Sequence, residues 1–126
     1  LDIKKNWLGR AQAFASAQGK TLSTDWLQLL SDLVNAGAGE VLMNAVDKDG
    51  TLSGPDLDLI RQASEQVNVP LIAGGGVSSL ADIKSAVVAG ASAVAAGAFF
   101  VYHGPHRAVL ITYPKYHELE LLFASS

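Results

Sequence analysis

The amino-acid sequence predicts an α/β fold with a parallel sheet, and two observations support this prediction. Short apolar runs typical of buried strands alternate with helix-like stretches along most of the chain. The segment AGAGEV at 36–41 recurs as AGASAV at 89–94, and each copy ends a helix and begins a buried strand. Such alternation implies parallel strands joined by right-handed crossovers. We therefore expect four βα units, which is half of a closed (β/α)8 TIM-barrel fold.

The predicted elements follow one another in this order. Strands are expected at residues 1–4, with an ambiguous continuation through 12–15, and at 40–46, 69–73 and 93–96. Ser23 or Thr24 would cap a first helix that ends at Asn35, with Asp25 in its first turn. The later helices would run from Pro55 and Asp56 to Gln66, from Ser78 or Ser79 to Ala89, and over 116–123 after Pro114.

Composition and charge argue against several classes of function. The chain has 126 residues, 49% hydrophobic and 17% charged, so a single domain with a modest core is expected. A net charge of −3 without a Lys/Arg cluster argues against nucleic-acid binding. Gly90 and Gly97 interrupt the apolar stretch 85–103, which argues against a membrane span. The lack of cysteine and of a visible secretory signal fits a cytoplasmic protein.

Glycine-rich turns follow the last two predicted strands. Gly74 to Gly76 follow the third strand, and Gly97 and Ala98 follow the fourth. Strand ends without side chains expose neighbouring backbone N–H groups, which is how parallel β/α proteins bind phosphate. In (β/α)8 barrels the phosphate site is frequently built by the loops after the last two strands. The sequence therefore predicts a phosphorylated small molecule as ligand, although such turns can equally be packing requirements between strand and helix.

Four βα units would leave an open sheet with two bare strand edges. We therefore expect either that the chain is a fragment of a longer barrel or that another half barrel, such as a second copy of the chain, completes it.

Four segments together resemble one family, the cyclase subunit of imidazole glycerol phosphate synthase. They are LDIKK, GAGEVLMNAVDKDGT, PLIAGGGVSSLADI and AVAAGAFF, and the likeness extends to about Phe100. The resemblance implies a (β/α)8 barrel whose fifth to eighth strands are present here. It also implies that residues 1–126 form one C-terminal half, with 101–126 as tail and last helix. The implied reaction is ammonia-dependent cyclisation of a phosphoribulosyl aminoimidazole carboxamide nucleotide in histidine biosynthesis, with ammonia supplied by a glutaminase partner and no cofactor.

The resemblance also assigns roles to single residues. Asp2 matches a catalytic aspartate that acts as general acid or base, whereas the competing interpretation is a strand-end carboxylate paired with Lys4. Glu40, at the opposite mouth of the barrel, matches a residue of the ring that admits ammonia, or is simply solvated. The positions expected to bind the substrate and its phosphate are Asp49, Gly50, Thr51, Gly75, Gly76, Gly97 and Ala98. A plain Asp-Gly turn is the alternative for the first of these, and no metal site is expected, because the three histidines lack the spacing that zinc requires.

The chain also departs from the family pattern. Asn44 and Ala45 stand where the cyclase usually has Thr-Ser, Gly74 replaces a serine, and Ala98 replaces another. The tail HGPHRAVLITYPKYHELELLF resembles a paralogous branch linked to amidation of surface sugars. Two alternatives therefore remain open, an ammonia-channelling subunit of a sugar amidotransferase and a non-catalytic half barrel that binds phosphate.

Overall fold

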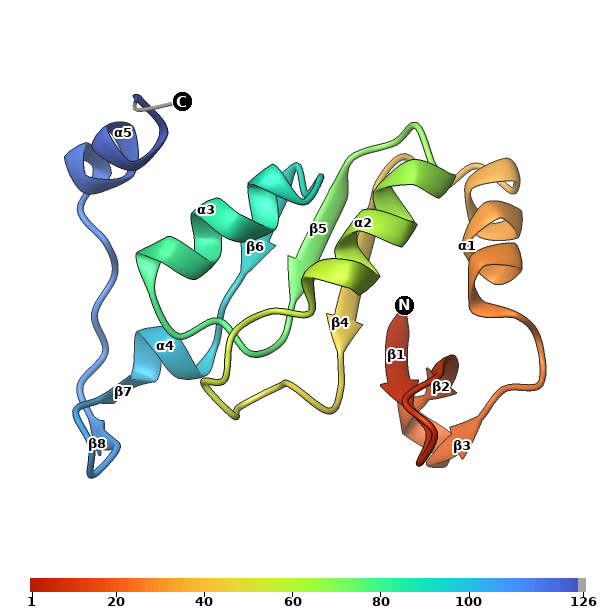
Figure 1. Ribbon diagram of the computed structural model, residues 1–126, viewed down its shortest axis with the longest axis horizontal. Helices are drawn as coiled ribbons and strands as arrows, with labels where there is room; N and C mark the ends of the chain where they lie inside the picture. The colour runs from red at the N-terminus through yellow and green to blue at the C-terminus, as the bar shows by residue number, and fades with distance from the viewer. Residues whose placement is uncertain (125–126) are drawn as a thin grey trace.

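The computed structural model describes residues 1–124, and helices cover one face of its main sheet (Figure 1). The sheet has six strands in the order β3-β2-β1-β4-β5-β6. In chain order the strands are β1 (Asp2–Lys5), β2 (Ala11–Ala15), β3 (Lys20–Thr21), β4 (Val41–Ala45), β5 (Leu71–Gly74) and β6 (Ala93–Ala95). A separate hairpin in the tail pairs β7 (Tyr102–His103) with β8 (Ala108–Val109).

Four of these strands form the expected parallel sheet. β1 pairs in parallel with β4, β4 with β5, and β5 with β6. Each crossover between β1 and β6 contains a helix, as the sequence predicts. The chain is thus a partial barrel of the (β/α)8 type, with strands close to their predicted bounds.

The ambiguous segment 12–15 is a separate strand and does not continue the first one. β2 runs antiparallel to β1, with Asp2 opposite Phe14 and Lys5 opposite Ala11. The reversal is made at Asn6, whose side-chain Oδ1 accepts hydrogen bonds from the backbone N–H groups of Leu8 (2.9 Å) and Arg10 (3.0 Å). An Asx turn of this kind competes with strand continuation, which explains the break.

The expectation of two bare strand edges is therefore only partly right. Over Asp2–Lys5 the outer edge of β1 is occupied by β2, and the two-residue β3 ends the sheet on that side. Within residues 1–124, β6 has no neighbour on its outer edge.

The described residues form five α-helices, of which four follow the predicted order and one, α4, was not expected. A 3₁₀ turn, η1 (Ser16–Gln18), precedes β3. The helices are α1 (Trp26–Asn35), α2 (Leu57–Gln66), α3 (Leu80–Val88), α4 (Ala98–Val101) and α5 (Tyr116–Ala124). The cap of α1 is Asp25, rather than Ser23 or Thr24, because its Oδ1 accepts from the N–H groups of Leu27 and Gln28, both at 3.0 Å. Among residues 1–124, no helix has the length and apolar character needed to cross a membrane.

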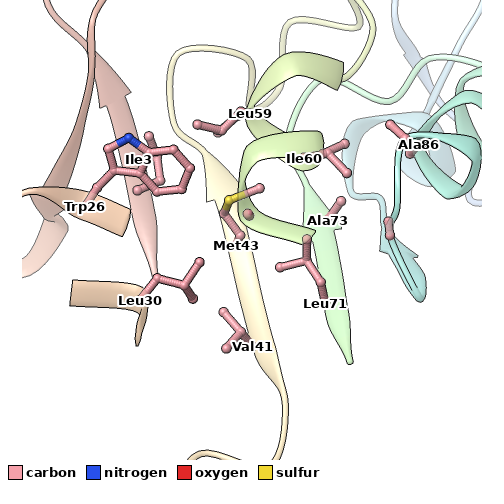
Figure 2. Packing of buried hydrophobic residues seen from close by; sticks show 14 of the residues in the cluster. Ile3, Trp26, Leu30, Val41, Met43, Leu59, Ile60, Leu71, Ala73 and Ala86 are labelled. Atoms are coloured by element: carbon pink, nitrogen blue, oxygen red, sulfur yellow. The ribbon is translucent and has the colours of Figure 1, made fainter. Parts of the chain in front are cut away.

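The core lies on one face of the sheet only. Along β4, Val41, Met43 and Ala45 are buried, whereas Leu42 between them is 51% exposed. Figure 2 shows the buried side chains gathered between the strands and the helices. A parallel sheet normally has both faces covered. The uncovered face, which carries Leu42, is the one that would face the interior of a closed barrel.

The start of α3 contains a reciprocal cap directly after the glycine turn. Ser79 Oγ accepts from the N–H of Asp82 (3.2 Å), and Asp82 Oδ2 accepts from the N–H (2.9 Å) and hydroxyl (2.7 Å) of Ser78. Partial burial acts to raise the pKa of the Asp82 carboxyl, but the hydrogen bonds from Ser78 and Ser79 outweigh it and hold this pKa below its ordinary value of 3.8.

Replacing Asp82 by Asn should lower the free energy of unfolding at pH 7 by about 1 kcal/mol, since the cap weakens and the negative charge at the helix N-terminus is lost. The lowered pKa makes this contribution fully present above the unfolded-state pKa and lost as pH falls through the folded-state pKa. Urea denaturation from pH 7 downward should therefore show the two proteins converging in acid. Glu65→Gln, at an exposed position of α2, is the control. A pH-independent difference would contradict this account.

Candidate functional site

The parallel register brings four residues into one row near the carboxyl ends of the strands. Asp2 is the partner of Asn44, Asn44 of Gly74, and Gly74 of Ala95. Gly74 and Ala95 are the last residues of β5 and β6, whereas Asp2 begins β1. The prediction that Asp2 ends a strand is therefore wrong, because β1 continues into the hairpin as far as Lys5. Asp2 nevertheless lies level with the strand ends from which the glycine turns start.

The carboxylate of Asp2 is held by a serine from the following loop. Ser16 Oγ donates a hydrogen bond to Asp2 Oδ2. The competing ion pair with Lys4 is not formed, because the Lys4 ammonium lies over the ring of Phe14, 5.1 Å from its centroid. No local pattern singles out Ser16, because the β1–β2 hairpin and η1 determine its position beside Asp2.

The loop after β4 is braced from within. Asp47 Oδ2 accepts from the backbone N–H of Lys5 at 2.6 Å, which ties this loop to β1. The Thr51 hydroxyl donates to the carbonyl oxygen of Lys48 (2.7 Å) and contacts Ser53 Oγ (2.7 Å). It is therefore engaged inside the loop, whereas a substrate-binding role requires it to face the ligand. Gly50 has a φ of 72°, the left-handed conformation that glycine tolerates. Asp49 is exposed, and its carboxylate has no partner within residues 1–124.

An arginine from the tail, which no sequence pattern singled out, also reaches this loop. The turn between β7 and β8 carries Arg107, whose guanidinium donates to the carbonyl oxygens of Gly50 (3.5 Å) and Thr51 (3.4 Å). Arg107 has a φ of 49°, an uncommon backbone conformation for a non-glycine residue. The contact spans 56 residues of sequence, so no local pattern could have predicted it.

Packing requires glycine in the turn after β5 but not in the turn after β6. A Cβ on Gly75 would lie 2.6 Å from the carbonyl oxygen of Ala45, and one on Gly76 would collide with that of Gly54. The Gly76 carbonyl also accepts from the N–H of Gly54 at 2.8 Å, so the loops after β4 and β5 are in direct backbone contact. Close packing therefore requires glycine at both positions, whatever else they do.

Gly97 has no such requirement. A Cβ there would meet nothing within 4 Å, and its φ of −112° is accessible to any residue. Gly97 precedes α4, whose first residue is Ala98. Glycine at a position without strain or crowding leaves room for a group from outside these residues to approach the backbone.

Glu40 lies at the opposite end of the sheet from the glycine turns, immediately before β4 and not, as expected, as the first residue of this strand. Its side chain is exposed and has no partner among the described residues. In residues 1–124, no group of three His, Asp or Glu side chains is placed to hold a metal ion.

Comparisons with known proteins place this geometry in context. A family model described as "Histidine biosynthesis protein" matches residues 1–106. The "Putative imidazole glycerol phosphate synthase subunit hisF2" of Pseudomonas aeruginosa is 38% identical over 126 residues, which cover 96% of this chain and 49% of the relative. The "Imidazole glycerol phosphate synthase subunit HisF" of Thermobifida fusca is 49% identical over 78 residues, 62% of this chain and 29% of the relative. The chain thus spans about half the length of the curated relative that it matches almost throughout.

The contrast between the two turns predicts that the same substitution has a large effect on stability in one and a small effect in the other. Gly76→Ala should destabilise the protein by at least about 2 kcal/mol, because the methyl group meets backbone at a positive φ. Gly97→Ala should change stability by less than about 0.5 kcal/mol. Thermal or urea unfolding of the two variants measures this difference directly. Equal stabilities would show that the close contact between the loops after β4 and β5 is not needed.

Proposed function

Because the chain belongs to the histidine biosynthesis protein family, we propose that it forms half of a cyclase-type (β/α)8 barrel. The proposed reaction is the ammonia-dependent closure of the imidazole ring of imidazole glycerol phosphate, from a phosphoribulosyl aminoimidazole carboxamide nucleotide. The observation that carries the proposal is the register of the four parallel strands. It sets the Asp2 carboxylate level with the strand ends that lead into the glycine turns.

Each part of this edge of the sheet has a role in the proposal. Asp2, oriented by the hydroxyl of Ser16, exchanges a proton with the substrate as the ring closes. Backbone N–H groups at Gly75, Gly76, Gly97 and Ala98 bind a phosphate, supported by the open space beside Gly97. The loop that contains Asp49, Gly50 and Thr51 contacts the substrate near that phosphate. Arg107 holds this loop through two of its carbonyl oxygens.

Two partners complete the proposal. Another half barrel would cover the open face of the sheet, where Leu42 is 51% exposed. It would come either from the rest of a longer protein or from a second copy of this chain. A glutaminase would supply ammonia at the opposite end, where Glu40 is free to take part in a charged ring.

The tail favours a second candidate function. The family model ends at residue 106, so most of the tail that resembles the paralogous branch lies outside it. The tail also contributes Arg107 to the loop after β4. These observations support the alternative that the chain serves a paralogous amidotransferase for surface sugars, in which the barrel conducts ammonia. A half barrel that binds phosphate without catalysis is the third possibility.

Asp2→Asn separates catalysis from binding. We expect turnover of the ribulosyl nucleotide with ammonia to fall by about 10²–10⁴-fold, because the amide cannot act as general acid or base. Binding of inorganic phosphate should be retained, since the glycine turns are unchanged. Asp32→Asn, at an exposed position of α1, is the matched control. Normal turnover by the Asp2 variant would exclude this role, and no turnover by the unsubstituted protein would favour the alternatives.

A second copy as the missing half can be tested through the open face of the sheet. Sedimentation equilibrium should show a dimer for this chain, and Leu42→Glu should yield folded monomers, because a charge on the covered face would be desolvated. Leu33→Glu, on the surface of α1 where the side chain is 42% exposed, should leave the dimer intact. Compact monomers of the unsubstituted chain would eliminate the twofold arrangement.

A further inference from the structure

The side chain of Asn44 has no structural explanation within residues 1–124. Asn44 is the fourth residue of the five-residue strand β4, and its buried neighbours Met43 and Ala45 place its side chain on the open face of the sheet. Asparagine is depleted in strands, because its amide competes with the backbone for hydrogen bonds. No residue in the described part of the chain hydrogen-bonds to this amide, and it does not belong to the core.

The surroundings of the amide are those of the proposed site. Asn44 pairs in register with Asp2 on one side and Gly74 on the other. Neighbouring strands lie about 4.8 Å apart, so the amide and the Asp2 carboxylate are adjacent on one face. Asn44 Oδ1 lies 3.4 Å from the point that a Cβ on Gly74 would occupy. The amide therefore extends over Gly74, in the direction of the glycine turns.

We propose that Asn44 is a specificity-determining residue, whose amide recognises the hydroxyl-bearing sugar chain of a phosphorylated substrate. This inference rests on the proposed function, because it needs the phosphate at the turns after β5 and β6 and the reacting atoms at Asp2. An amide offers two donors and one acceptor without a charge. That combination fits hydroxyl groups, whereas a second carboxylate beside Asp2 would repel an anionic substrate.

Gly74 supports the same role for the neighbouring position. Its φ is not among the positive values, so its conformation does not demand glycine. Any side chain there would stand against Asn44 Oδ1 at 3.4 Å and against Ala95 Cβ at 3.8 Å. With glycine, the acceptor side of the amide stays open toward a ligand on this face.

Two ligands test the proposal with the full chain. Inorganic phosphate reports on the glycine turns alone, and D-ribulose 5-phosphate reports on the turns and the sugar contact together. Calorimetric titration should show that the unsubstituted chain prefers the sugar phosphate. In Asn44→Ala that preference should fall by about five- to ten-fold, as expected for one lost hydrogen-bonding group, while phosphate affinity stays the same.

A control variant and the oligomeric state complete the test. Asn68→Ala, at an exposed position before β5, should keep the full preference. If Asn44→Ala keeps it as well, or only alters the oligomeric state in sedimentation, the amide does not recognise the sugar and the inference is overturned. If the unsubstituted chain binds neither probe, the proposed phosphate site itself is wrong, and the inference is overturned together with it.

Discussion

The parallel register of β1, β4, β5 and β6 is the constraint on which the rest of the structure depends. Backbone hydrogen bonds align the strands so that Asp2, Asn44, Gly74 and Ala95 form one row. Because side chains alternate between the faces of a sheet, the same register buries Ile3, Met43 and Ala73 against the helices. A shift of one residue in any strand would move its core residues to the open face and its residue of this row to the core. Fold and candidate site therefore share one set of hydrogen bonds.

The one-sided core explains the unusual surface of this chain. Helices cover the face that carries Met43, whereas the face that carries Leu42 is open in the described residues. Apolar residues exposed in the middle of a parallel sheet are rare in complete domains, because such sheets are normally covered on both faces. The open face is also where Asp2 and Asn44 lie, so whatever covers it would enclose the candidate site as well.

The loops at the carboxyl ends behave as one connected unit. Asp47 binds the backbone of β1, Gly76 binds Gly54, and Arg107 binds the loop at Gly50 and Thr51. These contacts join β1 and the loops after β4 and β5 with the tail. Rigid support of this kind helps to hold a binding site in its productive geometry. Gly97, in the turn after β6, has neither the crowding nor the positive φ that would require glycine.

The sequence by itself determined the order and type of the four parallel strands and of α1, α2, α3 and α5, because hydrophobic period, helix caps and glycine turns are local signals. It also predicted the parallel sheet, the family and the positions at its carboxyl edge, since the repeat at 36–41 and 89–94 and the motifs are contiguous. It did not predict α4 or the β7–β8 hairpin. Only the tertiary structure decided that β2 turns back on β1, that Ser16 binds Asp2, and that Arg107 reaches Gly50. The hairpin reverses at the local turn of Asn6, whereas the contacts of Ser16 and Arg107 join residues 14 and 57 positions apart. The geometry of these two contacts depends on how the packed sheet aligns the chain.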